Sequence, residues 1–269
     1  MRLNQIILLL VVFSISPLAS SNNTTCPRII SQSPYISKML DYLGLGECIV
    51  GVSRYSKRQL PHTGGILDPD AEAIDSLMPD LFITSDWTSL ETIEKIIPEK
   101  VKSIRLSSFN TMNQLEDNMA AIIKATNWQQ ANDKVRVFAQ SWRNKVKQVQ
   151  GNHKKVLLLS SCSGSAYSFG PDSRLYDLFT LAGFNVLESG RKIRHIRPGN
   201  EIEDLTRLLN HYQPDLLFIF EQTLTKQCQM LFPNKAVRIL NFDGKLFLHP
   251  TTAILDGLDS LILQKHSWQ

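Results

Sequence analysis

The sequence predicts an α/β protein with two Rossmann-like lobes, each built on a parallel sheet, joined by a long rigid α-helix. Short apolar runs alternate with amphipathic runs, which is the pattern of strands connected by helices. The same order of segments occurs twice along the 269 residues. Between the two copies lies a stretch whose apolar residues recur only at helical spacing. These three observations indicate a duplicated fold with a helical connection.

The first residues have the pattern of a cleavable export signal. Arg2 precedes an apolar run from Ile6 to Phe13, and small residues follow at Ala19 and Ser21. The run is too short to span a bilayer as a helix. We therefore expect residues 1–21 to be a signal peptide. The formal net charge of +4 is too small to indicate a nucleic-acid partner.

The two copies define an N-terminal lobe at 22–126 and a C-terminal lobe at 152–269. The amphipathic run SKMLDYLG ends at Gly44 and leads into CIVGV, and LYDLFTLAG ends at Gly183 and leads into FNVLE. Glycine just past a helix is a common C-terminal cap. MPDLFIT and QPDLLFIF then follow in the same order, and in each the proline ends the preceding helix.

The connecting stretch predicts two helices. One apolar stripe starts at Met112, and after Asn127 a second stripe runs Ala131, Val135, Phe138, Trp142, Val146 and Val149. The steps of three and four residues are typical of a helix. At about 1.5 Å per residue the second helix reaches roughly 30 Å. We expect it to form the linker over 127–151.

The four cysteines suit an exported protein. Cys26 and Cys48 each precede a short apolar run, RIIS and IVGV. If these runs are adjacent parallel strands, the two cysteines lie at one sheet edge, where a disulfide is possible. We predict that pair as a disulfide. Cys162 and Cys228 are less clearly matched, and for them buried free thiols are the alternative to a second disulfide.

Two segments carry a family resemblance. RIISQSPYISKMLDYLGLGECIVGVSRYS, followed by GGILDPDAEAIDSLMPDLFIT, resembles the helical-backbone (class III) substrate-binding proteins of ABC importers. Those receptors deliver cobalamin, haem or ferric siderophores to an inner-membrane permease. The resemblance implies a monomeric periplasmic receptor with no enzyme activity and no cofactor of its own. Its ligand is expected to be a chelate of cobalt or iron, and its protein partners the permease and ATPase subunits. A corrinoid such as cobalamin is the first candidate ligand.

Ligands of open parallel sheets bind beyond the carboxyl ends of the strands. Tyr55 follows the IVGVS run, Asp86 and Trp87 follow LFIT, and Tyr167 and Phe169 lie in the loop after VLLLSS. The resemblance implies that Tyr55, Tyr167 and an aromatic near Trp87 face the ligand. Aromatic side chains at a cleft suit a broad, partly apolar molecule. We expect all five to line the binding site.

The second lobe departs from the resemblance. RKIRHIRPG carries Arg194 and His195 together with Arg191 and Arg197, and Asp243 and Lys245 follow the last strand. The basic cluster is either a solvated loop or a rim that binds carboxylates or phosphates. The second interpretation favours a haem propionate or an acidic siderophore over cobalamin. His195 is then a candidate iron ligand.

Family receptors dock through one glutamate on each lobe. Glu72 matches the first position, since it lies near the start of the helix that ends before Pro79. In the second lobe the equivalent position is Arg207, and Glu203 one turn earlier is the expected substitute. The alternative for both is that they are ordinary acidic residues at a helix N-terminus.

Two other classes of protein remain. A zinc or manganese receptor shares the architecture, but of the six histidines only His62, His195 and His249 lie near expected loop ends. An enzyme is a weaker alternative, because SSCSG does not match G-x-S-x-G. A chelatase needs a histidine and an acid in the cleft, for which His195 and Asp86 are the candidates.

Overall fold

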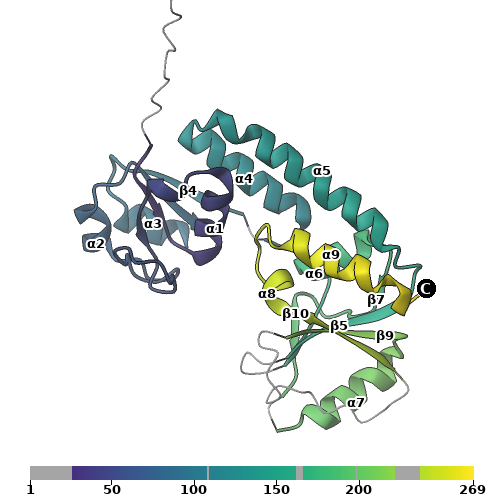
Figure 1. Cartoon of the computed structure of the whole chain (residues 1–269). Helices are drawn as coiled ribbons and strands as arrows, with labels where there is room; N and C mark the ends of the chain where they lie inside the picture. The colour runs from purple at the N-terminus through teal and green to yellow at the C-terminus, as the bar shows by residue number, and fades with distance from the viewer. Residues whose placement is uncertain (1–25, 108, 162–165, 198, 222–236) are drawn as a thin grey trace, which may run out of the picture.

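The computed structural model describes residues 26–107, 109–161, 166–197, 199–221 and 237–269. Within them the chain forms two sheets with helices on their faces, and two long helices run side by side between the halves (Figure 1). None of the helices in these residues is long and apolar enough to cross a membrane. The expected signal peptide lies outside the described residues.

The N-terminal half forms a parallel sheet. Its elements are β1 (Ile29–Ser31), α1 (Pro34–Leu43), η1 (Gly46–Cys48), β2 (Ile49–Val52), α2 (Ala71–Ser76), β3 (Leu81–Ser85), α3 (Leu90–Ile96) and β4 (Lys102–Leu106). The strand order is β2-β1-β3-β4. One face of this sheet packs on α1 and the other packs on α2 and α3. The helix α1 begins at its cap Ser33 and ends at Gly44, whose φ of 83° is the left-handed conformation that glycine adopts freely.

The C-terminal half repeats this sheet and extends it. Its elements are β5 (Lys155–Ser161), β6 (Tyr167–Phe169), α6 (Arg174–Leu181), β7 (Asn185–Val186), β8 (Ile193–His195), α7 (Glu201–Tyr212), β9 (Leu216–Glu221), β10 (Arg238–Asp243), α8 (Gly244–Phe247), α9 (Ile254–Gln264) and η4 (Lys265–Ser267). Its parallel strands run β7-β5-β9-β10, which matches the order in the first half. However, β6 and β8 are antiparallel to their neighbours, so this sheet is mixed rather than wholly parallel.

The repeated Pro-Asp pairs make the same contacts in both halves. The carboxylate of Asp80 accepts the amide of Arg28 at 2.7 Å, and that of Asp215 accepts the amide of Lys155 at 2.8 Å. Each aspartate amide donates back to the carbonyl of the same residue, at 2.9 and 2.8 Å. The aspartates thus join the starts of β3 and β9 to the starts of β1 and β5. They also satisfy a backbone donor that precedes or begins the strand.

Two helices connect the sheets. They are α4 (Met112–Thr126) and, after η2 (Gln129–Ala131), α5 (Asn132–Val149). Thr111 and Gln114 cap α4 reciprocally, which fixes its first turn. The helix expected over 127–151 therefore begins at 132, because Asn127 ends α4 in the left-handed conformation and η2 follows. In Figure 1, α5 lies along α4 and reaches α9, and it also packs on α1 and α6.

One apolar core passes through both halves. It includes Met39 of α1, Ile122 of α4, Phe138 and Trp142 of α5 and Leu258 of α9, all nearly or fully buried in one continuous cluster. Separate smaller clusters cover the far faces of the two sheets. Because α4 and α5 share packing with both sheets, bending between the halves requires opening this core. Interiors of such density resist that change.

Cys26 and Cys48 form a disulfide, with their Cα atoms 5.5 Å apart. The first precedes β1 and the second ends η1 directly before β2, and these two strands pair in parallel. The bond therefore joins the starts of adjacent strands, as the apolar runs predicted. Cys162 and Cys228 lie outside the described residues.

Candidate functional site

Two neighbouring cavities lie between the halves of the protein. The first, which we call the Arg174 cavity, has a volume of about 250 Å³. The N-terminal half contributes Ser33, Tyr35, Ile66, Ser85, Trp87, Phe109 and Asn110 to its wall, and the C-terminal half Tyr167, Phe169, Ser173, Arg174, Leu175, Lys192, Ile193, Leu248 and Pro250. Both halves are therefore needed to form it.

The second, which we call the Tyr55 cavity, has a volume of about 880 Å³. It is lined by Pro34, Tyr35, Ser37, Lys38, Asp41, Tyr55, Ser56, Lys57, Arg58, Ile66, Leu67, Trp87, Lys245 and His249. Tyr35, Ile66 and Trp87 line both cavities, so the two adjoin, and we call them together the cleft. A volume of this size is within the range of roughly 300 to 1,000 Å³ typical of small-molecule sites.

The aromatic residues expected at the site lie in this cleft. Tyr55 and Trp87 are 60% and 57% exposed, which is unusual for such large side chains. Across from them Tyr167 packs edge-on against Phe169, with ring centroids 5.1 Å apart. Both come from β6, the antiparallel strand, which carries these rings to the Arg174 cavity. Lys245, also expected at the site, lines the Tyr55 cavity.

Two helix N-termini point into the Arg174 cavity. Ser33 caps α1 by accepting the amide of Tyr35, and Ser173 caps α6 by accepting the amide of Tyr176, both at 3.3 Å. Both serines line the cavity. The positive ends of the helix dipoles therefore meet at this point, where they favour a negatively charged group.

Arg174 is the most unusual residue of the cleft. It is only 6% exposed, although it carries a guanidinium group. Nη2 donates to the carbonyl of Phe247 at 2.8 Å, but Nε and Nη1 have no hydrogen-bond partner among the described residues. Burial lowers the pKa of Arg174 to about 10, with Tyr35 and Asp177 opposing the shift. The side chain thus stays charged at neutral pH in a site that provides little compensation.

The charges along the cleft are mostly positive. Its described lining includes Arg174 and Lys192 in the first cavity, and Lys38, Lys57, Arg58 and Lys245 in the second. The acidic residue of this lining is Asp41, whose carboxylate is paired with Arg58. Arg174 itself has no carboxylate within 4 Å among the described residues. The cleft therefore presents a positive potential to anything that enters it.

Tyr35 and His249 connect the two halves across the cleft. Their rings stack with centroids 5.1 Å apart, Tyr35 coming from α1 and His249 from the segment after α8. Burial lowers the pKa of His249, and the nearby cations Lys38 and Arg174 lower it further. Burial also raises the pKa of Tyr35. Both groups are consequently neutral at neutral pH, which adds no negative charge to the site.

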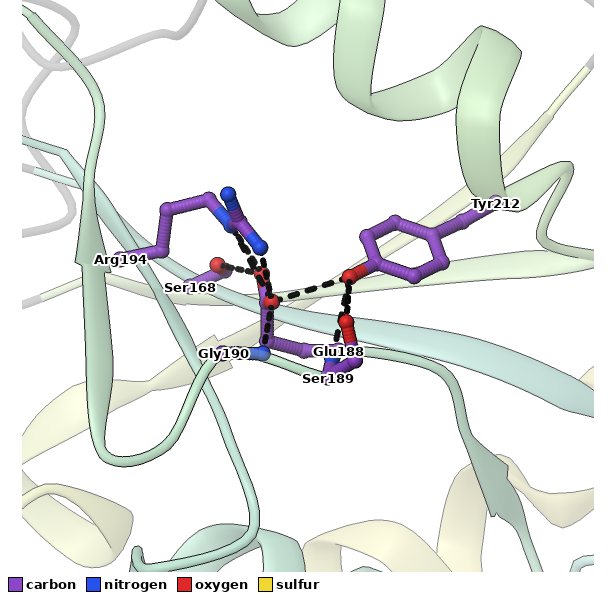
Figure 2. A network of polar contacts seen from close by, with 6 residues as sticks. All are labelled: Ser168, Glu188, Ser189, Gly190, Arg194 and Tyr212. Carbon is purple, nitrogen blue, oxygen red and sulfur yellow. Dashed lines mark hydrogen bonds and ion pairs between the residues drawn. The ribbon is translucent and has the colours of Figure 1, made fainter.

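Arg194 lies elsewhere than expected. Figure 2 shows that it reaches Glu188, which also accepts from Ser168, Tyr212 and the amide of Gly190. Burial alone would raise the pKa of Glu188, but these hydrogen bonds, that of Arg194 first, lower it to about 2. Arg194 occupies β8, where successive side chains alternate between the faces of a sheet. Its neighbour Ile193 therefore lines the cleft while Arg194 turns to the opposite face.

Other predicted site residues also lie outside both cavities. His195 packs near Tyr167, with ring centroids 6.0 Å apart, but lines a separate surface pocket with Arg194 and Tyr212. Asp243 caps α8 by accepting the amide of Lys245 at 2.9 Å. Asp86 is half-buried, and its Oδ1 has no partner among the described residues.

The remaining basic residues of the expected rim form ion pairs at the surface. Arg191 pairs with Asp172 at 3.0 Å, and Arg197 pairs with Asp204 at 2.7 Å. Neither arginine lines either of the two cavities. The cations that line the two cavities are instead Arg58, Arg174 and lysines.

The two glutamates expected to dock a permease are exposed on α2 and α7. Glu72 is in the first turn of α2 and forms no ion pair with any described residue. Glu203 pairs with Arg207 one turn along α7, with both side chains about two-thirds exposed. In Figure 1, α2 and α7 lie at the outer ends of the two halves, away from α5.

The described residues offer little for a bare metal or for catalysis. They contain no group of three or more His, Cys, Asp or Glu side chains placed to hold a metal ion. The proposed chelatase pair, Asp86 and His195, shares neither cavity of the cleft. Part of the SSCSG segment lies outside the described residues.

Sequence reasoning missed Arg174, Tyr35 and Phe109. Arg174 directly precedes the run LYDLFTLAG, and nothing local shows which way a side chain at the start of a helix points. One available signal was an arginine between the cap Ser173 and the apolar run LYDLF, at the position equivalent to Pro34 in the first copy. Tyr35 follows the cap Ser33 in the same way.

Comparisons with known proteins identify the fold. No family model matches the chain, and no curated protein matches it. Among solved structures, the periplasmic vitamin B12 binding protein BtuF of Vibrio cholerae is similar over 90% of this chain and 98% of its own, with a TM-score of 0.68 at 18% identity. The periplasmic heme binding protein HutB of Vibrio cholerae is similar over 89% of this chain and 98% of its own, with a TM-score of 0.69 at 20% identity.

The siderophore binding protein BauB, bound to a complex of ferric iron and two molecules of acinetobactin, is similar over 91% of this chain and 93% of its own. Its TM-score is 0.65 at 18% identity. At these identities the likeness concerns the fold. The chain therefore has the two-lobed α/β fold of these binding proteins, and the fold expected from the sequence is confirmed.

Proposed function

We propose that this protein is a periplasmic substrate-binding protein of an ABC importer, which holds a metal chelate in the cleft and delivers it to an inner-membrane permease. The observation that carries the proposal is the cleft itself. It lies between two sheets of equal strand order, and its aromatic walls come from both halves. No catalytic step is part of the proposal.

The chemistry of the walls supports a chelate with a large organic framework. Tyr55 and Trp87 offer broad exposed rings on one side, and Tyr167 and Phe169 offer rings on the other. Such surfaces bind flat or partly apolar molecules with little loss of side-chain entropy. Proteins of the same fold bind vitamin B12, heme or a siderophore–iron complex. A corrinoid is the first candidate from the resemblance of the N-terminal half, with haem and ferric siderophores as the alternatives.

The lobes are proposed to span 22–126 and 152–269, with 127–151 between them. The core that passes through α4 and α5 supports a small closure when ligand binds, since a larger rotation would separate packed side chains. Glu72 on α2 and Glu203 on α7 are proposed to contact the permease. Exposure of both supports this role, and for Glu72 so does the lack of an ion pair with any described residue.

The test is a calorimetric titration of the purified protein with cyanocobalamin, haemin and a panel of ferric siderophores, each in a separate experiment. We expect saturable one-to-one binding of one chelate class. Free Zn²⁺ and Mn²⁺ are titrated in parallel, and metal content is measured after purification. Binding of a free metal ion without any chelate would replace the proposal by a metal receptor. Metal insertion into free porphyrin would replace it by a chelatase.

A further inference from the structure

We propose that the Arg174 cavity is an oxyanion subsite, in which the guanidinium group of Arg174 binds a carboxylate or phosphate carried by the ligand. The inference rests on the proposed function and specifies the class of chelate, one with an anionic group that reaches between the two halves. It assigns the anionic contact to Arg174 instead of the arginines of β8 and its flanking segments.

The first argument is the state of the guanidinium. Arg174 is only 6% exposed, and two of its nitrogens have no hydrogen-bond partner among the described residues. A buried charge of this kind is destabilising unless it is paired and hydrogen-bonded. Arg174 lines a cavity formed by both halves, and a ligand oxygen in that cavity would approach its guanidinium group. Guanidinium groups match carboxylates and phosphates in geometry as well as charge.

The second argument is the surroundings of that group. The capped N-termini of α1 and α6 line the same cavity, and both favour a negative charge there. Tyr35 and Tyr167 line the same cavity, and each carries a hydroxyl group that can donate a hydrogen bond. Lys192 adds a further cation. None of the described residues lining this cavity is acidic.

The position of Arg174 is fixed by the fold. Nη2 is held by the carbonyl of Phe247, the last residue of α8. Phe247 is itself fully buried and packs against Phe179, Phe220 and Phe242. The guanidinium is therefore oriented before any ligand enters, and little side-chain entropy remains to be lost on binding.

The oxyanion has two possible sources, and matched ligands distinguish them. Haemin carries carboxylates that its dimethyl ester lacks. Cyanocobalamin carries a phosphodiester that dicyanocobinamide lacks. Ferric citrate carries carboxylates, whereas ferrioxamine B is a hydroxamate chelate without them. Each pair is titrated against the wild-type protein and against Arg174→Met, with Arg136→Met as the control. Arg136 is exposed on α5, pairs with Asp133 and lines neither cavity of the cleft.

We expect the wild-type protein to bind the oxyanion-bearing member of one pair more tightly than its partner. In Arg174→Met the affinity for that member falls roughly 10- to 100-fold, the range for a hydrogen bond to a charged group, and the preference disappears. Arg136→Met keeps the preference, and Arg174→Lys, which retains charge without the planar fork, recovers only part of it. Circular dichroism and thermal melting verify that each variant is folded. We expect the empty Arg174→Met protein to melt at or above the wild-type temperature, because it lacks the uncompensated charge.

Two outcomes overturn the inference while leaving the receptor function in place. One is that the wild-type protein binds a chelate and its matched partner without the oxyanion equally tightly. The other is a preference that survives in Arg174→Met. If no chelate binds, the proposed function fails, and thermal melting with inorganic phosphate and citrate at matched ionic strength decides the subsite separately. A rise in melting temperature in the wild type that Arg174→Met loses supports it, and the absence of a rise in the wild type refutes it.

Discussion

The substitution Glu188→Gln tests whether the network of Figure 2 holds the edge of the C-terminal sheet. Glu188 has no exposed side-chain surface, and its carboxylate accepts from Arg194 at 2.8 and 2.9 Å. Glutamine keeps the shape but removes the charge, and its NH2 group replaces one of the two acceptor oxygens. It can therefore accept from Ser168, which bonds Oε2, or from Tyr212, which bonds Oε1, but not from both. The variant keeps the packing while it removes the charge and part of the hydrogen bonding. Because β8 carries Ile193 to the cleft, the network also supports one wall of the site.

The expected size of the effect follows from the pKa of Glu188. A decrease from 4.5 to about 2 corresponds to roughly 3 kcal/mol at about 1.36 kcal/mol per pKa unit. Arg194 is 46% exposed, so solvent screens part of the interaction, and we expect a loss of about 2 kcal/mol at pH 7. For a chain of this size that is roughly 4 to 8 °C in melting temperature.

The pH dependence has a defined sign. The pKa of Glu188 is lower in the folded state, so its contribution is present above pH 4.5 and is lost as the pH falls toward about 2. Wild-type protein and Glu188→Gln should therefore differ at pH 7 and converge as the medium becomes more acidic. Thermal melting followed by circular dichroism from pH 7 to pH 3 measures this difference.

The control is Glu203→Gln, which removes an exposed charge paired with Arg207 one turn along α7. Such surface pairs contribute roughly 0 to 1 kcal/mol, so we expect a shift of at most a few degrees. The reasoning about Glu188 is refuted if its substitution shifts melting no more than the control. It is also refuted if the difference from wild type stays constant across the pH range.

Three further predictions concern the cleft, the docking surface and the disulfide. Tyr55→Ala or Trp87→Ala should weaken chelate binding, measured by calorimetry, by about 1 to 3 kcal/mol, which is the scale of a lost aromatic contact. Unchanged affinity in both variants would show that the ligand does not bind in this cleft. Glu72→Ala should leave chelate binding intact but reduce cellular uptake. The control Glu91→Ala, in the first turn of the neighbouring α3, should leave uptake unchanged. Normal uptake by Glu72→Ala would contradict the docking role. Cys26→Ser should lower stability by about 3 kcal/mol because the disulfide closes a separation of 22 residues, and a melting temperature equal to that of wild type would contradict this.

Much of the fold was predictable because its signals are local. Gly44 caps its helix in the left-handed conformation, and Gly183 follows α6 in the same conformation, as glycine after an amphipathic run predicts. Pro79 and Pro214 mark the points where helices end and buried strands begin. The period of the apolar residues also placed the connecting helices, although η2 moved the start of the second one. These features depend on neighbours a few residues away.

The residues that line the cleft were only partly predictable. Residues after the strands, such as Tyr55 and Trp87, were placed correctly in the cleft because the carboxyl ends of parallel strands meet at one edge. The antiparallel strand β8 was not expected, and it moved Arg194 out of the cleft. A single step along a strand reverses the direction of a side chain, so a loop interpretation of RKIRHIRPG could not assign its faces.

The sequence by itself determined the order of strands and helices, the duplication and the aromatic character of the site. Only the tertiary structure decided where the charges lie. Arg174 is buried between the halves because α6 packs beside α8, and residues more than seventy positions apart meet there. Arg194, from a cluster that looked more suitable, is neutralised by Glu188. Charge is visible in a sequence, but its burial and its partner depend on packing between segments far apart in the chain.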